Sequence, residues 1–190
     1  MPRLLLFFQA DCPTCRLIVP YVNALARNGV RPLVLTAPEP GGGLTEARVA
    51  ARARQGVDTL VVGSDPFAFI EVIKRLQAGG VVAVLLDRPP APTRVAVEFF
   101  GRPFAASIAA AELARASGCV VLPVFIVRDA AGYRADTLPP LAYDRAALGD
   151  RAGRVAFTGR ILRVFEPVIR QHPDQWFHFV PVWPETEGHQ

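Results

Sequence analysis

Runs of apolar residues alternate along the chain with segments of helical periodicity. Continuous apolar runs predict buried strands at residues 4–8, 32–35, 58–62, 81–86 and 120–127, and a polar–apolar alternation predicts a strand at 94–99. Apolar residues at helical spacing predict helices at 16–27, 44–55, 66–78, 104–116 and 154–170. After a turn at 128–132, residues 133–137 read as a short strand. This order predicts an α/β layered domain with a mixed, mostly parallel sheet flanked by helices.

The composition supports one folded domain over residues 1–190. Hydrophobic residues make up 51% of the 190 positions, charged residues only 20%, and the mean hydropathy is +0.27, which excludes a disordered chain. The longest apolar runs fall far short of the ~18 residues expected of a transmembrane helix. We therefore expect a chain that spans no membrane.

The net charge of +4 comes almost entirely from arginine. Of the 21 basic side chains, all except Lys74 are arginines. A GC-rich genome would explain this bias, and so would partners that carry phosphate or carboxylate groups. The arginines are scattered and no exposed aromatics interleave with them, so nucleic-acid binding is not expected.

The three cysteines do not suggest a secreted disulfide framework. Their number is odd, and no secretory signal precedes them. Cys119 lies in an apolar run and is expected to be a small core residue. The cysteines and histidines also lack the spacing of a zinc site, so no metal is expected. These features favour the cytoplasm.

Three predicted strand ends carry arginine. Ligands bind beyond the carboxyl ends of strands in open α/β sheets. There the sequence places Asp87-Arg88, the turn Phe99-Phe100-Gly101-Arg102-Pro103 and Arg128. If these ends converge, they form an anion site. The alternative is that Asp87 pairs with Arg88 or another neighbour and the remaining arginines are solvated.

The middle turn makes this prediction specific. Gly101 would allow a tight turn, and Pro103 would begin the helix that follows. We expect Arg88 and Arg102 to face a common groove bordered by Phe99 or Phe100, suited to an anionic head with an acyl tail.

Four segments resemble a known family. They are Gly80-Val-Val-Ala-Val-Leu-Leu-Asp-Arg88, Val97-Glu-Phe-Phe-Gly-Arg-Pro103, Ser117-Gly-Cys-Val-Val-Leu-Pro-Val-Phe125 and His172-Pro-Asp-Gln-Trp-Phe177. In this order and spacing they resemble the bacterial lipid A biosynthesis acyltransferases, the lauroyl and myristoyl transferases of the lysophospholipid acyltransferase superfamily. The resemblance runs from about residue 29 to residue 184.

The resemblance implies an enzyme that moves a fatty acyl chain from acyl carrier protein or coenzyme A to a hydroxyl of a lipid A precursor or lysolipid. It implies no bound cofactor, since the thioester is a substrate. The partners would be the acyl donor and an anionic or phosphosugar lipid. The protein would lie peripherally on the cytoplasmic side of the bacterial inner membrane, or otherwise in the cytoplasm. The substrate-binding residues would be Asp87, Arg88, Phe100, Gly101, Arg102, Pro103 and Arg128.

One family feature is missing from the sequence. The family places a His-x-x-x-x-Asp/Glu motif after the first strand, with the histidine as general base on the acceptor hydroxyl. The only histidines here are His172, His178 and His189, and none begins that motif. Members also carry a membrane-anchoring portion before the motif, so we expect a fold that is incomplete at the N-terminus. The sequence leaves open an active, a truncated or rearranged, or a non-catalytic member.

The first 35 residues carry a different resemblance. Leu4 to Arg16 contains Cys12-Pro-Thr-Cys15 and resembles the strand–CxxC–helix start of a thioredoxin-like protein. In a thiol–disulfide exchange protein, Cys12 would be the exposed nucleophile and Cys15 the resolving thiol. The alternative is two incidental thiols at a helix start. A non-catalytic interaction domain is the third reading.

Four aromatic residues lie close together near the C-terminus of the sequence. Trp176, Phe177, Phe179 and Trp183 are expected to cover one end of the core or to contact a membrane interface. No serine lies in a Gly-x-Ser-x-Gly elbow, and the triple glycine at 41–43 lacks the Lys-Ser/Thr of a phosphate-binding loop.

Overall fold

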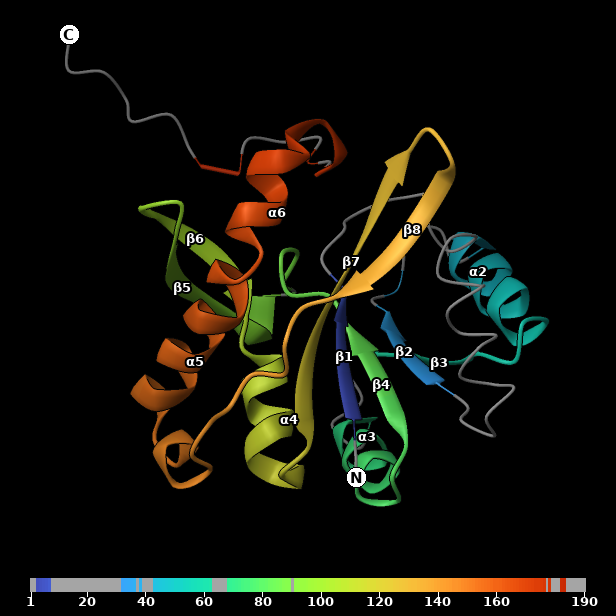
Figure 1. Cartoon of the computed structure of the whole chain (residues 1–190). Coiled ribbons are helices and arrows are strands. Elements are labelled where there is room, and N and C mark those ends of the chain that lie inside the picture. The colour runs from blue at the N-terminus through green and yellow to red at the C-terminus, as the bar shows by residue number, and fades with distance from the viewer. Residues whose placement is uncertain are drawn as a thin grey trace, which may run out of the picture.

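The structure is a computed structural model of the chain, shown in Figure 1. It describes residues 3–7, 32–36, 38, 43–62, 68–89, 91–176, 178, 182 and 183, with 3–7 described by backbone alone. Outside these residues lie the predicted helix at 16–27, the first two residues of the helix predicted at 66–78, Cys12 and Cys15.

A six-stranded mixed sheet forms the centre of the fold. Its strand order is β3-β2-β4-β1-β7-β8, and every neighbouring pair is parallel except β7 with β8. The strands are β1 (Arg3–Phe7), β2 (Pro32–Thr36), β3 (Asp58–Val61), β4 (Val81–Val84), β7 (Val120–Asp129) and β8 (Gly132–Thr137). The predicted fold class is confirmed, and each predicted parallel strand is present.

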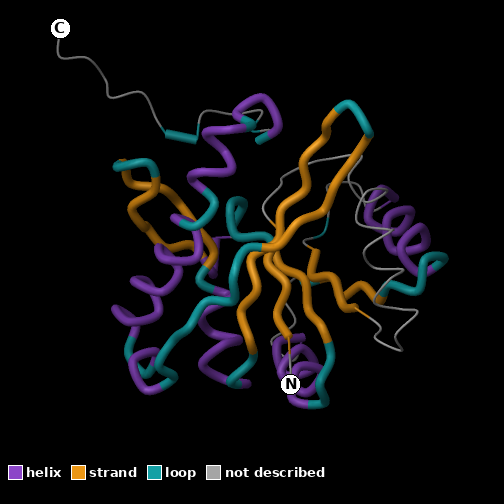
Figure 2. Tube along the Cα trace, in the orientation of Figure 1, coloured by secondary structure: helices purple, strands orange, loops and turns teal. Residues whose placement is uncertain are grey.

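Burial explains the strand positions. All four residues of β4 are buried, as expected for a parallel strand covered on both faces. The apolar run predicted to continue to residue 86 stops being strand at Val84; Leu85 is exposed, whereas Leu86 is buried. β7 and β8 continue as a two-stranded arm beyond the other strands (Figure 2).

A separate two-stranded hairpin lies beside the sheet. β5 (Arg94–Phe99) and β6 (Arg102–Ser107) pair antiparallel, with Phe99 opposite Arg102. β5 alternates exposed and buried residues as predicted. The predicted helix at 104–116 is wrong in its first turn, because residues 104–107 belong to β6. Pro103 therefore does not begin a helix; it lies exposed within β6.

Helices pack on the sheet and on the hairpin. They are α2 (Gly43–Ala53), α3 (Ala68–Gln77), α4 (Ala109–Ser117), α5 (Arg151–Arg163) and α6 (Glu166–Gln171), with 3-10 turns at Ala91–Thr93, Ala146–Leu148 and Pro173–Gln175. α4 contacts β1 and β7, and α5 contacts both α4 and β5. α5 thereby joins the hairpin to the sheet layer, as Figure 1 shows.

The predicted long helix at 154–170 is two helices. Asp150 caps α5, its side chain accepting from the Gly153 N–H at 2.6 Å, so the helix begins earlier than predicted. α5 ends at Arg163 and α6 begins three residues later, at Glu166, with Pro167 in its first turn. Proline lacks an N–H and its ring clashes with the carbonyl four residues earlier, here that of Arg163, so a continuous helix cannot form.

One apolar cluster fills the space between these layers. It includes Val82 and Val84 of β4, Phe99 of β5, Leu113 of α4 and Ile161 of α5. No helix within the described part of the chain is long and apolar enough to cross a membrane.

Candidate functional site

The β5–β6 turn is built on two residues with positive φ. Phe100 has φ 54° and Gly101 has φ 72°, the combination of a type I′ hairpin turn. Glycine adopts this conformation without strain, so the tight turn expected at Gly101 is present. Phe99 is fully buried before the turn, and Phe100 is half-buried within it.

The first turn of α6 fixes this hairpin turn. The backbone N–H of Phe100 donates to Glu166 Oε1 at 2.9 Å, and Glu166 Oε2 accepts from Arg170 at 3.1 Å. The Arg170 guanidinium lies 5.0 Å from the centroid of the Phe100 ring. The hairpin end and α6 are thus one connected unit.

Asp87 is a buried carboxylate beyond the end of β4. Its side chain is 0% exposed. Its Oδ2 accepts from the indole N–H of Trp176 at 3.4 Å and lies 3.4 Å from His178 Nε2. Its Oδ1 is buried without a hydrogen-bond partner. No pairing of Asp87 with Arg88 is seen; its described partners come from the C-terminal segment.

Trp176 is the centre of an aromatic cluster that joins three parts of the chain. Its ring centroid lies 5.7 Å from that of Phe99, 6.2 Å from Phe100 and 6.3 Å from Trp183. The Arg102 guanidinium lies 5.4 Å from the Trp183 ring centroid. The expectation that these aromatics cover one end of the core is confirmed for Trp176 and Trp183, which pack against it.

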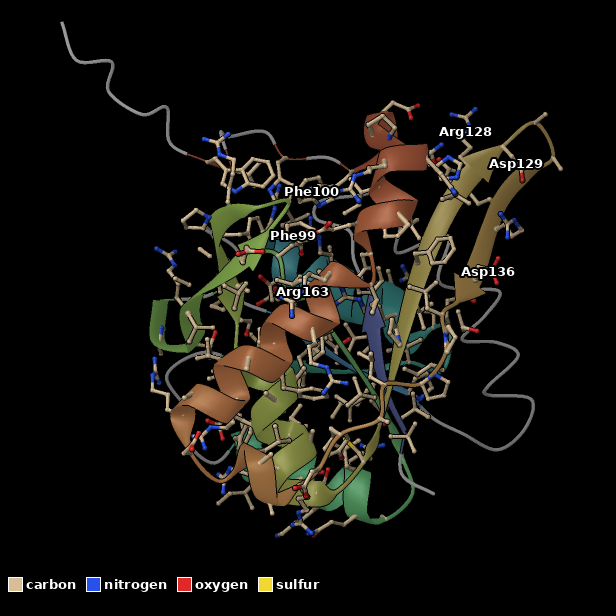
Figure 3. The ribbon with its side chains drawn as sticks, turned by 60° about the vertical axis from the view of Figure 1, so that its left-hand side comes forward. Phe99, Phe100, Arg128, Asp129, Asp136 and Arg163 are labelled. Atoms are coloured by element: carbon tan, nitrogen blue, oxygen red, sulfur yellow. The ribbon has the colours of Figure 1, made fainter. Side chains whose placement is uncertain are left out.

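Gln175 ties the same segment to β7. Its Oε1 accepts from the Arg128 N–H at 2.7 Å, and its Nε2 donates to the Arg128 carbonyl at 3.0 Å. The Arg128 side chain instead lies over Tyr133, with its guanidinium 5.7 Å from that ring centroid. Figure 3 shows α6 between Phe100 and Arg128, so the Arg128 side chain is not brought together with the hairpin turn.

The other residues predicted to bind substrate differ in how exposed they are. Arg88 and Arg102 are exposed, whereas Asp87 is buried. Gly101 and Pro103 form the turn and the start of β6. A groove shared by Arg88 and Arg102 stays a prediction.

A small, open hollow with mainly apolar walls lies between β7 and α6. Its walls are Phe125, Ile126, Val127, Phe165, Val168, Ile169, His172, Gln175 and Trp176. It lies next to the aromatic cluster, because Trp176 belongs to both. None of the predicted arginines lines it.

Three polar residues of this region have no counterpart among the predicted site residues. They are Glu166, Gln175 and His178, and each contacts a residue between 47 and 91 positions away. Glu166 could have been noticed as an acid beside the helix break at Pro167, and Gln175 as part of the His-Pro-Asp-Gln-Trp segment. His178 carries no such sequence signal.

Cys119 is buried away from these residues, as expected for a small core residue. Burial raises the pKa of its thiol, which disfavours the nucleophilic thiolate. Within the described residues, no group of three or more metal-ligating side chains gathers at one place.

Comparison with known proteins adds two findings. Residues 44–185 match the model of the family described as bacterial lipid A biosynthesis acyltransferase. A 121-residue stretch is 29% identical to the phosphatidylinositol mannoside acyltransferase of Mycobacterium tuberculosis (strain CDC 1551 / Oshkosh), covering 64% of this chain and 36% of that protein. The chain thus matches little more than a third of the length of this relative. Neither finding supports the thioredoxin-like alternative.

Proposed function

The chain belongs to the bacterial lipid A biosynthesis acyltransferase family, and on that basis we propose that it transfers a fatty acyl chain from a thioester to a lipid hydroxyl. The donor would be an acyl carrier protein or coenzyme A thioester. The acceptor would be an anionic or phosphosugar lipid, in line with the mannoside named for the mycobacterial relative.

One observation carries the proposal: the segments that resemble the family meet in space. Trp176 of the C-terminal segment donates to Asp87 and packs against Phe99 and Phe100 of the hairpin. Its neighbour Gln175 pairs with the backbone of β7. Residues that are far apart in sequence thus pack together at the end of the sheet where α/β proteins bind ligands.

The chemistry of this surface suits an acyl thioester. Exposed Arg102 beside Trp183 offers a charge to an anionic head. The adjacent small hollow has mainly apolar walls, which suit contact with an apolar chain. Together they provide the two kinds of contact that an amphipathic donor requires.

Arg102→Ala tests the anionic contact. Loss of one charge-assisted interaction costs about 1.5–3 kcal/mol, so the Kd of the variant for palmitoyl-coenzyme A should rise about 10- to 150-fold. Titration calorimetry with a thioether analogue of the donor would measure it.

Arg94→Ala is the matched control, because Arg94 is also exposed but begins β5 at the opposite end of the hairpin. We expect donor binding by this variant to stay within twofold of the original chain. Equal effects of both substitutions would show that overall charge, and not Arg102, governs binding.

We also propose a peripheral position on the cytoplasmic face of the bacterial inner membrane. The support is the half-buried pair Trp176 and Trp183 next to Arg102 and Arg170, since tryptophan and arginine together favour an anionic membrane interface.

A further inference from the structure

Strand β8 is an edge of the six-stranded sheet. Within the described part of the chain, β7 is the one strand that pairs with β8, and it does so over residues 124–129. β1 pairs with β7 only as far as Val124, so β8 lies along the arm that projects beyond the other strands (Figure 2). On β8, Tyr133 is 51% exposed. A strand in this position can accept a further strand along its open side.

The hydrogen bonds of Arg128 identify the backbone groups of β8 that point outward. Arg128 lies opposite Tyr133 in the β7–β8 pair. Its N–H and its carbonyl both bond to the Gln175 side chain, at 2.7 and 3.0 Å, so neither is available to Tyr133. In an antiparallel pair, residues that exchange no backbone hydrogen bonds direct their N–H and C=O groups away from each other's strand. The N–H and C=O of Tyr133 therefore point away from β7.

Every second residue of β8 has the same backbone direction. Because this direction alternates along a strand, the N–H and C=O groups of Ala135 and Thr137 also point outward. At the end of β8, the Leu138 N–H donates to the Pro123 carbonyl in β7 at 3.0 Å, as the alternation requires. β8 thus offers the backbone groups of three residues to a further strand.

The side chains of β8 are arranged so that two copies of the strand attract each other. Arg134 and Asp136 lie on one face of β8, with side chains 55% and 46% exposed, on either side of Ala135. When two β8 strands pair antiparallel about Ala135, Arg134 of each copy lies opposite Asp136 of the other. Tyr133 in the same way lies opposite Thr137. Opposite charges in directly opposed positions stabilise a strand pair.

The same charges disfavour the neighbouring registers. Outward-facing residues must meet each other, so the allowed registers differ by a slide of two residues. Sliding in one direction puts Arg134 opposite Arg134, and sliding in the other puts Asp136 opposite Asp136. Like charges in opposed positions are destabilising. The charges therefore select the register that is centred on Ala135.

We propose that this chain forms a symmetric dimer through β8, in which the sheets of two copies join into one. Ala135 exchanges both backbone hydrogen bonds with its counterpart, and Tyr133 does so with Thr137. The Thr137 N–H, which bonds to Asp136 Oδ1 at 3.1 Å in the single chain, then donates across the interface. Asp136 accepts from Arg134 of its own strand and also faces Arg134 of the second copy. One strand from each copy makes a small interface, so we expect a weak dimer that depends on protein concentration.

Sedimentation velocity of the full chain, from about 1 µM to about 1 mM, tests the dimer. Asp136→Arg opposes arginine to arginine at two positions, and Arg134→Asp opposes aspartate to aspartate. Each substitution should raise the Kd of the dimer at least about tenfold. Mixing the two variants opposes unlike charges again, so the mixture should form a heterodimer with roughly the original Kd. The double variant Arg134→Asp/Asp136→Arg should dimerise with itself for the same reason.

Asp129→Arg is the matched control. It makes the same change of charge as Asp136→Arg, and Asp129 also lies beside Arg134, with 4.0 Å between Oδ2 and Nε. Asp129 belongs to β7, one strand away from the proposed interface, and Figure 3 shows it toward the tip of the arm with Asp136 further along β8. The dimer Kd of this variant should stay close to that of the original chain. Far-ultraviolet circular dichroism checks that each variant is folded.

Amide hydrogen exchange provides a second measurement. The N–H groups of Tyr133 and Ala135 should exchange more slowly at high than at low protein concentration, because only the dimer gives them a strand partner. A chain that sediments as a monomer over the whole range overturns the proposal. A dimer that Asp136→Arg leaves unchanged, or that Asp129→Arg weakens equally, also overturns it, as does a mixture of the two single variants that stays monomeric. None of these results depends on acyl transfer.

Discussion

Single hydrogen bonds position the candidate site. Asp87 is held by Trp176, the Phe100 backbone by Glu166, and the Arg128 backbone by Gln175. In each case a side chain from residues 166–176 reaches a partner distant in sequence. Because a buried polar group that loses its partner destabilises the fold, each bond constrains the path of the C-terminal segment.

Tyr143 provides a test of stability at this scale. Its hydroxyl donates to the Cys119 carbonyl at 2.5 Å, and burial raises its pKa to about 12. Tyr143→Phe should lower the free energy of unfolding by about 1 kcal/mol, measured by urea denaturation. Tyr133→Phe is the control, because Tyr133 is exposed on β8.

The raised pKa of Tyr143 also predicts a pH dependence. An unfolded tyrosine loses its proton near pH 10, whereas folded Tyr143 keeps it to about 12. The contribution of this group to stability is therefore complete below pH 10 and is lost as the pH rises from 10 to 12. Tyr143→Phe should lose less stability than the original chain over that window; parallel curves would contradict the argument.

At the level of elements, residues 104–107 form a strand of the β5–β6 hairpin although their local sequence favours a helix. Alanines at 105 and 106 favour helix, and the prediction followed them. The positive φ angles of Phe100 and Gly101 instead fold the chain back, so that Phe104 and Ala106 are buried in a strand. The turn at Gly101 was expected, but the strand that follows it was not, because the alanine-rich stretch after the turn favours a helix.

Gly101→Ala tests this account of the turn. A Cβ at position 101 meets nothing within 4 Å, but φ 72° is strained for alanine, so the free energy of unfolding should fall by about 1–2 kcal/mol. Gly43→Ala also meets nothing within 4 Å and lies in α2 without a positive φ. We expect it to be neutral or slightly stabilising in the same urea titration; equal losses would show that backbone strain is not the cause.

On the scale of the whole molecule, charge and aromatic rings gather where the hairpin, α6 and the C-terminal segment meet. Arg102 lies over Trp183 and Arg170 over Phe100. Both arginines add positive charge beside aromatic rings at this end of the molecule. Clustered positive charge favours the binding of anionic partners.

Vesicle binding tests the proposed membrane position. The chain should sediment with phosphatidylglycerol vesicles at low salt and release at 1 M salt, because screening weakens exposed charge interactions. Arg102→Ala and Arg170→Ala should each weaken binding about fivefold, from ~1 kcal/mol per arginine near the surface. Arg94→Ala, at the opposite end of the hairpin, is the control. Equal binding to neutral phosphatidylcholine vesicles would contradict the proposal.

The sequence alone determined the fold class, most strand positions and the family. Continuous apolar runs predict strands that are buried on both faces of a parallel sheet, because a strand in that position needs apolar residues whichever elements cover it. The sequence also predicted the β5 alternation and, within one residue, the end of α4, which Gly118 caps with φ 67°. The sequence predicted helix boundaries less accurately than strand positions, as the Asp150 cap and the break before Pro167 show.

Only the tertiary structure decided which residues share the candidate site. Asp87 and Arg102 could be predicted as site residues because they lie at the ends of predicted strands. Arg128, predicted in the same way, instead lies against Tyr133, and Pro103 lies in a strand rather than at a helix start. His178 was unmarked, because nothing local distinguishes it from an ordinary surface histidine. Its Nε2 lies 3.4 Å from a carboxylate oxygen of Asp87, 91 positions earlier, and such long-range contacts are set by how the elements pack, which no local pattern of residues records.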